Sequence, residues 1–156
     1  MAQGAGVAAT GTDSINRQSA GAAASGRAVK VYCDGGCRPN PGPIEVAVVL
    51  RGRVMVRSDM GHGSHRDAEW LALIAAVQQA SAQGLRQIVV LADAREVVQQ
   101  ASAALAAGTA AAMPAAAQRH AENLLAAAAA IQVLRLRWVK RQQNLAGIAL
   151  AARHPR

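Results

Sequence analysis

Hydrophobic and polar residues follow two different periods along the chain, and the changes of period divide the sequence into strands and helices. Apolar and polar residues alternate from Val29 onward, as in a strand that is half-buried in a sheet. Apolar residues at helical spacing begin just after Arg66. The predicted strands span 29–34, 44–50, 53–58, 87–92 and 131–139, and the predicted helices span 66–83, 94–105, 114–130 and 142–152.

The order of these elements, β-β-β-α-β-α-α-β-α, predicts a mixed α/β fold. The tight turn at Arg51-Gly52 joins two of the first three strands, which we expect to form an antiparallel meander. The continuous apolar run at 87–92 is typical of a central parallel strand. We therefore predict a five-stranded mixed sheet with helices on both faces.

Composition divides the chain into one folded unit and two ends. Residues 1–27 contain almost no large apolar side chain, so we predict a disordered, low-complexity tail that cannot offset its ordering entropy. Residues 28–152 form the predicted domain, and 153–156 form a short basic tail. A chain of 156 residues with 52% hydrophobic content suits a single domain with a real core.

The charge of the chain is strongly positive and unevenly placed. Of a formal net charge of +8, six basic residues and no acid lie between Arg135 and the end. This excess suggests a polyanionic partner, with nucleic acid first, although a solubilising basic surface explains it equally well. The sequence shows no signal peptide or membrane span, and its two cysteines make no disulfide framework, so we expect a cytoplasmic protein.

Three acidic residues occupy positions where a sheet can present ligands. Asp34 ends the first strand and Asp93 ends the strand 87–92, while Glu69 lies in the first helical turn after residue 66. Each has a structural explanation as well: Asp34 and Asp93 can cap a turn or a helix, and a helix dipole favours Glu69. If the three converge on one strand-end crevice they repel each other, and a Mg²⁺ ion would relieve that repulsion.

Four segments of the sequence resemble the type 1 ribonuclease H family: "YCDGGCRPNPGP", "RDAEWLALIAAV", "VVLADA" and "LRWVKRQQNLAGIALA". The resemblance runs from about residue 29 to 152 and implies an RNase H-like fold. It also implies an endonuclease that uses one or two Mg²⁺ or Mn²⁺ ions to hydrolyse the RNA strand of RNA–DNA hybrids. The expected partner is such a hybrid or a structured RNA, with no membrane, and we expect a monomer.

The resemblance also assigns roles to individual residues. It implies that Asp34, Glu69 and Asp93 are both the catalytic residues and the metal ligands. The nucleic-acid contacts that it implies are Gly35, Gly36, Arg38, Asn40, His65, Arg66, Arg141 and Asn144.

The last predicted helix departs from the family pattern Asn-x-x-Ala-Asp-x-Leu-Ala. Gly147 and Ile148 replace Ala-Asp, so Ile148 stands at a degenerate fourth-ligand position. Two functions therefore stay open: a nuclease with reduced activity, and a catalytically degenerate RNase H-like module that binds nucleic acid. On the preceding strand, Trp138 is expected to face the core, whereas Arg135 and Arg137 point to the other side, where a helix could cover them.

Overall fold

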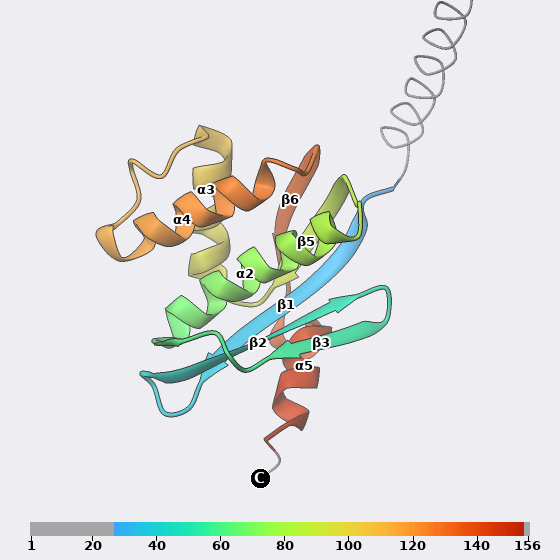
Figure 1. Ribbon diagram of the computed structural model, residues 1–156, viewed down its shortest axis with the longest axis vertical. Coiled ribbons are helices and arrows are strands. Elements are labelled where there is room, and N and C mark those ends of the chain that lie inside the picture. Colours follow the sequence, from blue (N-terminus) through green and yellow to red (C-terminus); the bar gives the residue numbers. More distant parts are fainter. Residues whose placement is uncertain (1–26, 155–156) are drawn as a thin grey trace, which may run out of the picture.

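The computed structural model describes residues 27–154, which form a mixed sheet with helices on both faces (Figure 1). Nearly all of the predicted disordered tail lies outside the described residues, as do residues 155–156 at the end of the predicted basic tail. The main sheet has the strand order β3-β2-β1-β5-β6. These strands are β1 (Val29–Cys37), β2 (Gly42–Leu50), β3 (Arg53–Arg57), β5 (Gln87–Ala92) and β6 (Val133–Trp138).

Strand directions follow the predicted pattern. β1, β2 and β3 pair antiparallel as a meander, and β1, β5 and β6 pair in parallel. A two-residue strand, β4 (His62–Gly63), adds to β2 in a segment that was predicted to be a loop. β1 also continues three residues beyond Asp34, because its pairing with β2 persists after its pairing with β5 has ended.

The helices are divided unequally between the two faces of the sheet (Figure 1). α2 (His65–Ala82) packs on β1 and β2, and α3 (Arg95–Ala107) and α4 (Ala115–Ala128) lie beside it. The predicted last helix is interrupted at Asn144, which separates a 3₁₀ turn, η1 (Arg141–Gln143), from α5 (Leu145–Ala152). α5 packs against β1, β2 and β3 and buries its own small apolar cluster there.

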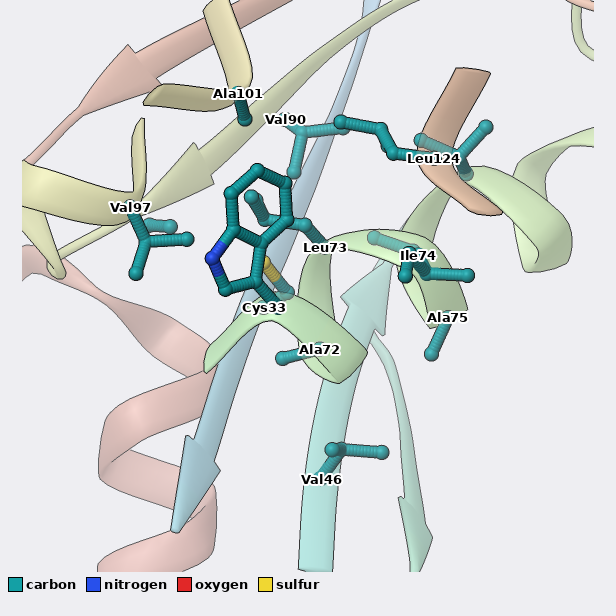
Figure 2. Close-up of a cluster of buried hydrophobic side chains, with 14 of the residues drawn as sticks. Cys33, Val46, Ala72, Leu73, Ile74, Ala75, Val90, Val97, Ala101 and Leu124 are labelled. Carbon is teal, nitrogen blue, oxygen red and sulfur yellow. The ribbon is translucent and has the colours of Figure 1, made fainter. Parts of the chain in front are cut away.

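The main core lies between the sheet and the α2 side (Figure 2). Cys33 and Val90 from the strands meet Leu73 from α2, Val97 from α3 and Leu124 from α4. Alanine fills much of this layer: Ala68, Ala72, Ala76 and Ala80 of α2 are all fully buried. Small side chains on this stripe let the helix lie close to the sheet, which matters for the site described next. No helix among residues 27–154 is long and apolar enough to cross a membrane.

Candidate functional site

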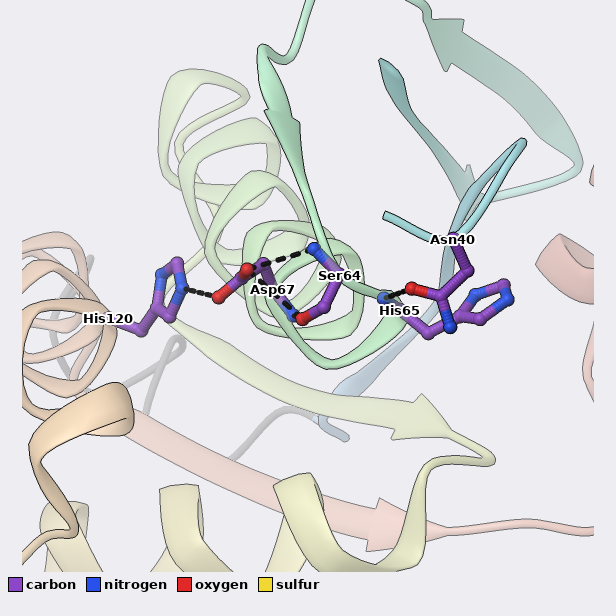
Figure 3. A network of polar contacts seen from close by, with 5 residues as sticks. All are labelled: Asn40, Ser64, His65, Asp67 and His120. Carbon is purple, nitrogen blue, oxygen red and sulfur yellow. Dashed lines mark hydrogen bonds and ion pairs between the residues drawn. The ribbon is translucent and has the colours of Figure 1, made fainter. Parts of the chain in front are cut away.

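The first turn of α2 is fixed by its own side chains (Figure 3). Ser64 caps the helix by accepting a hydrogen bond from the Asp67 amide, and the Asp67 carboxylate accepts one from the Ser64 amide in return. Asn40 Oδ1 accepts a hydrogen bond of 3.2 Å from the His65 amide, which ties the β1–β2 loop to the start of the helix. The capping box and the Asn40–His65 hydrogen bond together fix the start of α2. They therefore set the position of Glu69, which comes directly after the first turn.

Further along, Asp67 accepts a hydrogen bond from outside the helix. Its Oδ1 lies 2.8 Å from His120 Nε2 of α4 (Figure 3), and the His120 ring stacks on the buried ring of Trp70. These contacts hold α4 against the start of α2, so they support the same turn from a second side.

A glycine allows α2 to approach β1 at the site itself. A Cβ atom added at Gly35 would lie 2.1 Å from the Ala68 carbonyl oxygen, a distance that no real side chain tolerates. Gly35 is therefore required for the packing that brings Glu69 beside Asp34, and it also lines the cleft.

The three predicted acids do converge. Asp34, Glu69 and Asp93 each offer a carboxylate oxygen within 4.8 Å of the other two. Asp34 is 6% exposed, and Glu69 and Asp93 are partly buried. The prediction that these acids meet at the carboxyl ends of β1 and β5, beside the start of α2, is confirmed.

Burial and mutual repulsion change the protonation of this cluster. Burial, followed by the charge of Asp93, raises the pKa of Asp34 to about 6. Burial, followed by the charges of Asp34 and Asp93, raises the pKa of Glu69 to about 9, so Glu69 keeps its proton at neutral pH and donates it to Asp34. The guanidinium of Arg141 acts in the opposite direction on both pKa values but does not cancel the shift.

The donor set fits a hard divalent cation. Three convergent carboxylate oxygens beside a cleft of about 340 Å³ leave room for the water ligands that Mg²⁺ retains. A divalent ion bound here would also favour the charged form of the carboxylates, so it would displace the proton that the cluster holds. Asp34, Glu69 and Asp93 are the residues that would hold it.

Asp93 is held in place by Asn144. The Asn144 side chain donates hydrogen bonds to Asp93 Oδ2 at 3.0 Å and to the Cys33 carbonyl at 2.9 Å. Its Oδ1 accepts from the Ala146 amide and so caps α5. Asn144 is fully buried, so the prediction that it contacts nucleic acid is wrong; it is a positioning residue for Asp93.

Trp138 supports the same carboxylate from the backbone side. Its Nε1 donates a 3.0 Å hydrogen bond to the Asp93 carbonyl. Trp138 lies on the same face of β6 as Leu134 and Leu136, as predicted, but the prediction that it is buried in the core is wrong. The residue is 36% exposed, and the Arg95 guanidinium lies 4.2 Å from the centre of its ring.

The fourth corner of the site is formed by Gly147 rather than Ile148. A Cβ atom at Gly147 would lie 3.5 Å from both Asp34 Oδ2 and Asp93 Oδ2. Ile148 is 53% exposed and is not among the residues that line the cleft. Of the two residues that stand in place of Ala-Asp, Gly147 is therefore the one that lines the cleft, and the assignment of Ile148 as the fourth-ligand position stays a prediction.

The rim of the cleft is basic, and most of the predicted nucleic-acid residues are on it. Asn40 and Arg66 are exposed outside the cleft lining, with Asn40 bonded to the His65 amide and Arg66 bonded to Glu96 at 2.7 Å. The predicted residues that line the cleft are Gly35, Gly36, Arg38, His65 and Arg141.

Glu45 and His154 also line the cleft, and sequence reasoning did not include them among the site residues. Glu45 lies opposite Gly36 across the β1–β2 ladder and hydrogen-bonds His154 Nε2, with Arg153 3.6 Å away. Glu45 is thus occupied by the end of α5 rather than by the acidic cluster. Glu45 lies two residues before Ala47, the residue opposite Asp34. The period of the strand was therefore the available signal that Glu45 is on the same face of the sheet as Asp34.

Comparison with known proteins agrees with the mixed sheet and helices described above. A family model described as reverse transcriptase-like matches residues 32–154. The RNase H1 of the halophilic archaeon Halobacterium salinarum NRC-1 is 26% identical, with a TM-score of 0.67 over 80% of this chain and 94% of that chain. The N-terminal RNase H domain of a Mycobacterium tuberculosis protein, solved as a fusion with maltose-binding protein, is 25% identical, with a TM-score of 0.63 over 81% of this chain and 96% of its own.

A more distant structure shares the fold alone. LC11-RNase H1, solved in complex with an RNA/DNA hybrid, is 20% identical, with a TM-score of 0.58 over 75% of this chain and 88% of that chain. None of the curated proteins matches the chain.

Proposed function

The chain belongs to the reverse transcriptase-like family of RNase H-like proteins, and from this premise we propose that it is a divalent-metal-dependent endoribonuclease that hydrolyses the RNA strand of RNA–DNA hybrids. The observation that carries the proposal is the convergence of Asp34, Glu69 and Asp93 within 4.8 Å in a cleft with a basic rim. Three acids held this close repel one another, and this repulsion destabilises the folded protein unless a cation binds to them.

The residues divide the work of such a reaction between them. A bound divalent ion would activate water and stabilise the leaving oxygen. Asp34 interacts with both Glu69 and Asp93 and is the least exposed of the three. Asn144 and Trp138 keep Asp93 in place. Arg38, His65 and Arg141 line the cleft and would contact the phosphate backbone of a bound hybrid.

The test is cleavage of a labelled hybrid by the purified protein with Mg²⁺ or Mn²⁺. We expect the RNA strand to be cut and the DNA strand to remain intact, with no cleavage in EDTA. Asp34→Asn keeps the size of the side chain and removes its charge, so it should abolish cleavage. An RNA strand left intact by the native protein, or cut equally well by Asp34→Asn, would contradict the proposal.

One observation favours a second function, a binding module that does not cut. Among residues 27–154, Asp34, Glu69 and Asp93 are the only group of three or more acids, histidines or cysteines close enough to share a metal, and α5 presents Gly147 to them instead of a carboxylate. Calorimetric titration of the metal-free protein with Mg²⁺ and Mn²⁺ separates the two functions at the level of the site. Hybrid binding together with the absence of both metal binding and cleavage would support the module.

A further inference from the structure

The face of the sheet that carries α5 is only partly covered. α5 packs on β1, β2 and β3, while Arg135 and Arg137 of β6 are exposed. The sequence allows a helix to cover these two arginines, but in the structure both side chains are exposed to solvent. Leu134 and Leu136, which alternate with them, pack on the main core, so the arginines point to the α5 side.

Strand register places further basic residues in line with Arg135. Lys30 pairs with Val89, and Val89 pairs with Arg135, so Lys30 and Arg135 lie in one row across three strands, about 10 Å apart. Arg51 extends this row on the other side of Lys30, and the two residues line one hollow of about 270 Å³. We define the basic face by these four residues: Lys30, Arg51, Arg135 and Arg137.

The charge of the basic face is not compensated by acids. All four side chains are exposed, and none of them takes part in an ion pair with the described carboxylates, whose basic partners lie elsewhere. A surface that is basic only for solubility needs no such separation of charge. A patch of one sign concentrates polyanions near it, and phosphates spaced along a nucleic-acid backbone match a row of separated cations.

The basic face approaches the cleft along β1, and basic residues of β6 and the segment after it join the two. On β1, Lys30 precedes Asp34 by four residues on the same side of the strand, a distance of ~13 Å. On β6, the chain passes from Arg137 through Lys140 to Arg141, which lines the cleft. A backbone that lies in the cleft can therefore follow Arg141, Lys140 and Arg137 onto this face.

We propose that the basic face binds the phosphate backbone of the hybrid that occupies the cleft, beyond the position of cleavage. Tyr32 and Leu145, which share the hollow with Lys30 and Arg51, supply apolar contact for sugars or bases. The inference rests on the proposed function for the identity of the nucleic acid. The contact itself is independent of sequence and does not require that the site cut.

The test compares two double variants that lose the same charge. Arg135→Gln/Arg137→Gln removes half of the basic face. Arg53→Gln/Arg119→Gln removes two exposed arginines from β3 and α4, of which Arg53 pairs with the core-facing Leu50 and so lies on the opposite side of the sheet. Binding of a labelled RNA–DNA hybrid is measured in EDTA over a series of salt concentrations, after circular dichroism and urea midpoints have confirmed that both variants fold.

Each lost phosphate contact lowers the slope of log K against log salt by about 0.9. We expect a slope reduced by about 2 for Arg135→Gln/Arg137→Gln and an almost unchanged slope for the control. Equal slopes for both variants, whether reduced or unchanged, or no binding by the native protein, would overturn the inference. Cleavage by the native protein is measured separately, so that the two proposals can fail independently. If the native protein cuts the hybrid but the slope does not change in Arg135→Gln/Arg137→Gln, only the inference about the basic face is refuted. If the slope changes but the native protein does not cut, only the proposed reaction is refuted.

Discussion

Replacing Glu69 by Gln should make the metal-free protein more stable, and the gain should grow with pH. The folded protein keeps a proton on Glu69 up to a pKa of about 9, whereas the unfolded chain releases it near 4.5. Between these values the folded state binds more protons than the unfolded state, so the free energy of unfolding falls as pH rises. Below 4.5 and above 9 the dependence ends, and Asp34 adds a smaller effect of the same sign up to about pH 6.

The size of the effect follows from the shift. One pKa unit corresponds to about 1.4 kcal/mol, so at pH 7 the proton on Glu69 costs the folded state about 3 kcal/mol relative to pH 4.5. Glutamine has the shape of the protonated acid and can still donate to Asp34, but it releases no proton on unfolding. The variant should therefore exceed the native protein by about 3 kcal/mol at pH 7 and by very little near pH 4.5.

Urea unfolding in EDTA from pH 5 to pH 8 measures this difference. Glu122→Gln, at an exposed position on α4, is the matched control, and its difference from the native protein should stay small at every pH. Saturating Mg²⁺ should reverse the order at pH 8, because the ion stabilises the native cluster and finds one ligand fewer in the variant. A difference between Glu69→Gln and the native protein that does not change with pH would refute the reasoning.

Three further changes test how the site is held. Asn144→Ala removes the support of Asp93 and the cap of α5, so we expect a loss of about 2 kcal/mol in urea unfolding and about 10–100-fold weaker Mg²⁺ binding by calorimetry; unchanged metal affinity would contradict its positioning role. Gly147→Asp should tighten Mg²⁺ binding and lower the Tm of the metal-free protein at pH 8, while Ile148→Asp should do neither, and the reverse ranking would favour the sequence pattern over the geometry. Ser64→Ala should lower the free energy of unfolding by about 1 kcal/mol through loss of the cap, and an unchanged value would show that Asn40 alone fixes the start of α2.

Much of the fold was predictable because long periodic segments decide it. Strand β5 was predicted to the residue, since the apolar run at 87–92 is typical of a central parallel strand. The convergence of the three acids was also predictable, because strand direction and element order place their Cα atoms at one edge. Strand β4 could not be foreseen, since two residues in a glycine-histidine loop carry no period.

The details of the site escaped for a different reason: they depend on side-chain direction at a resolution finer than one residue. The pattern around Asn144 identified a helix but could not show that its side chain turns inward, where it donates hydrogen bonds to the Asp93 carboxylate and the Cys33 carbonyl. A difference of one position on a helix is a rotation of about 100°, and it decides whether Gly147 or Ile148 faces the carboxylates. The exposure of Trp138 has another cause: its side chain is on the predicted face, but β6 lies at the sheet edge, where the core ends before the strand does.

The unequal division of helices between the two faces has a consequence for how the molecule opens. α5 has eight residues, fewer than an isolated helix needs. It contributes two of the four residues in its buried cluster, and β2 contributes the other two, with Asn144 at one end of the helix and the Glu45–His154 contact at the other. Such an element is expected to detach and reattach as a unit while the rest of the sheet stays folded. Backbone amides of α5 should therefore exchange with deuterated solvent well before those of β1 or β5. Each opening also withdraws Asn144 from Asp93, so the fraction of time for which the acidic cluster is intact is set by the local stability of α5 rather than by that of the whole domain.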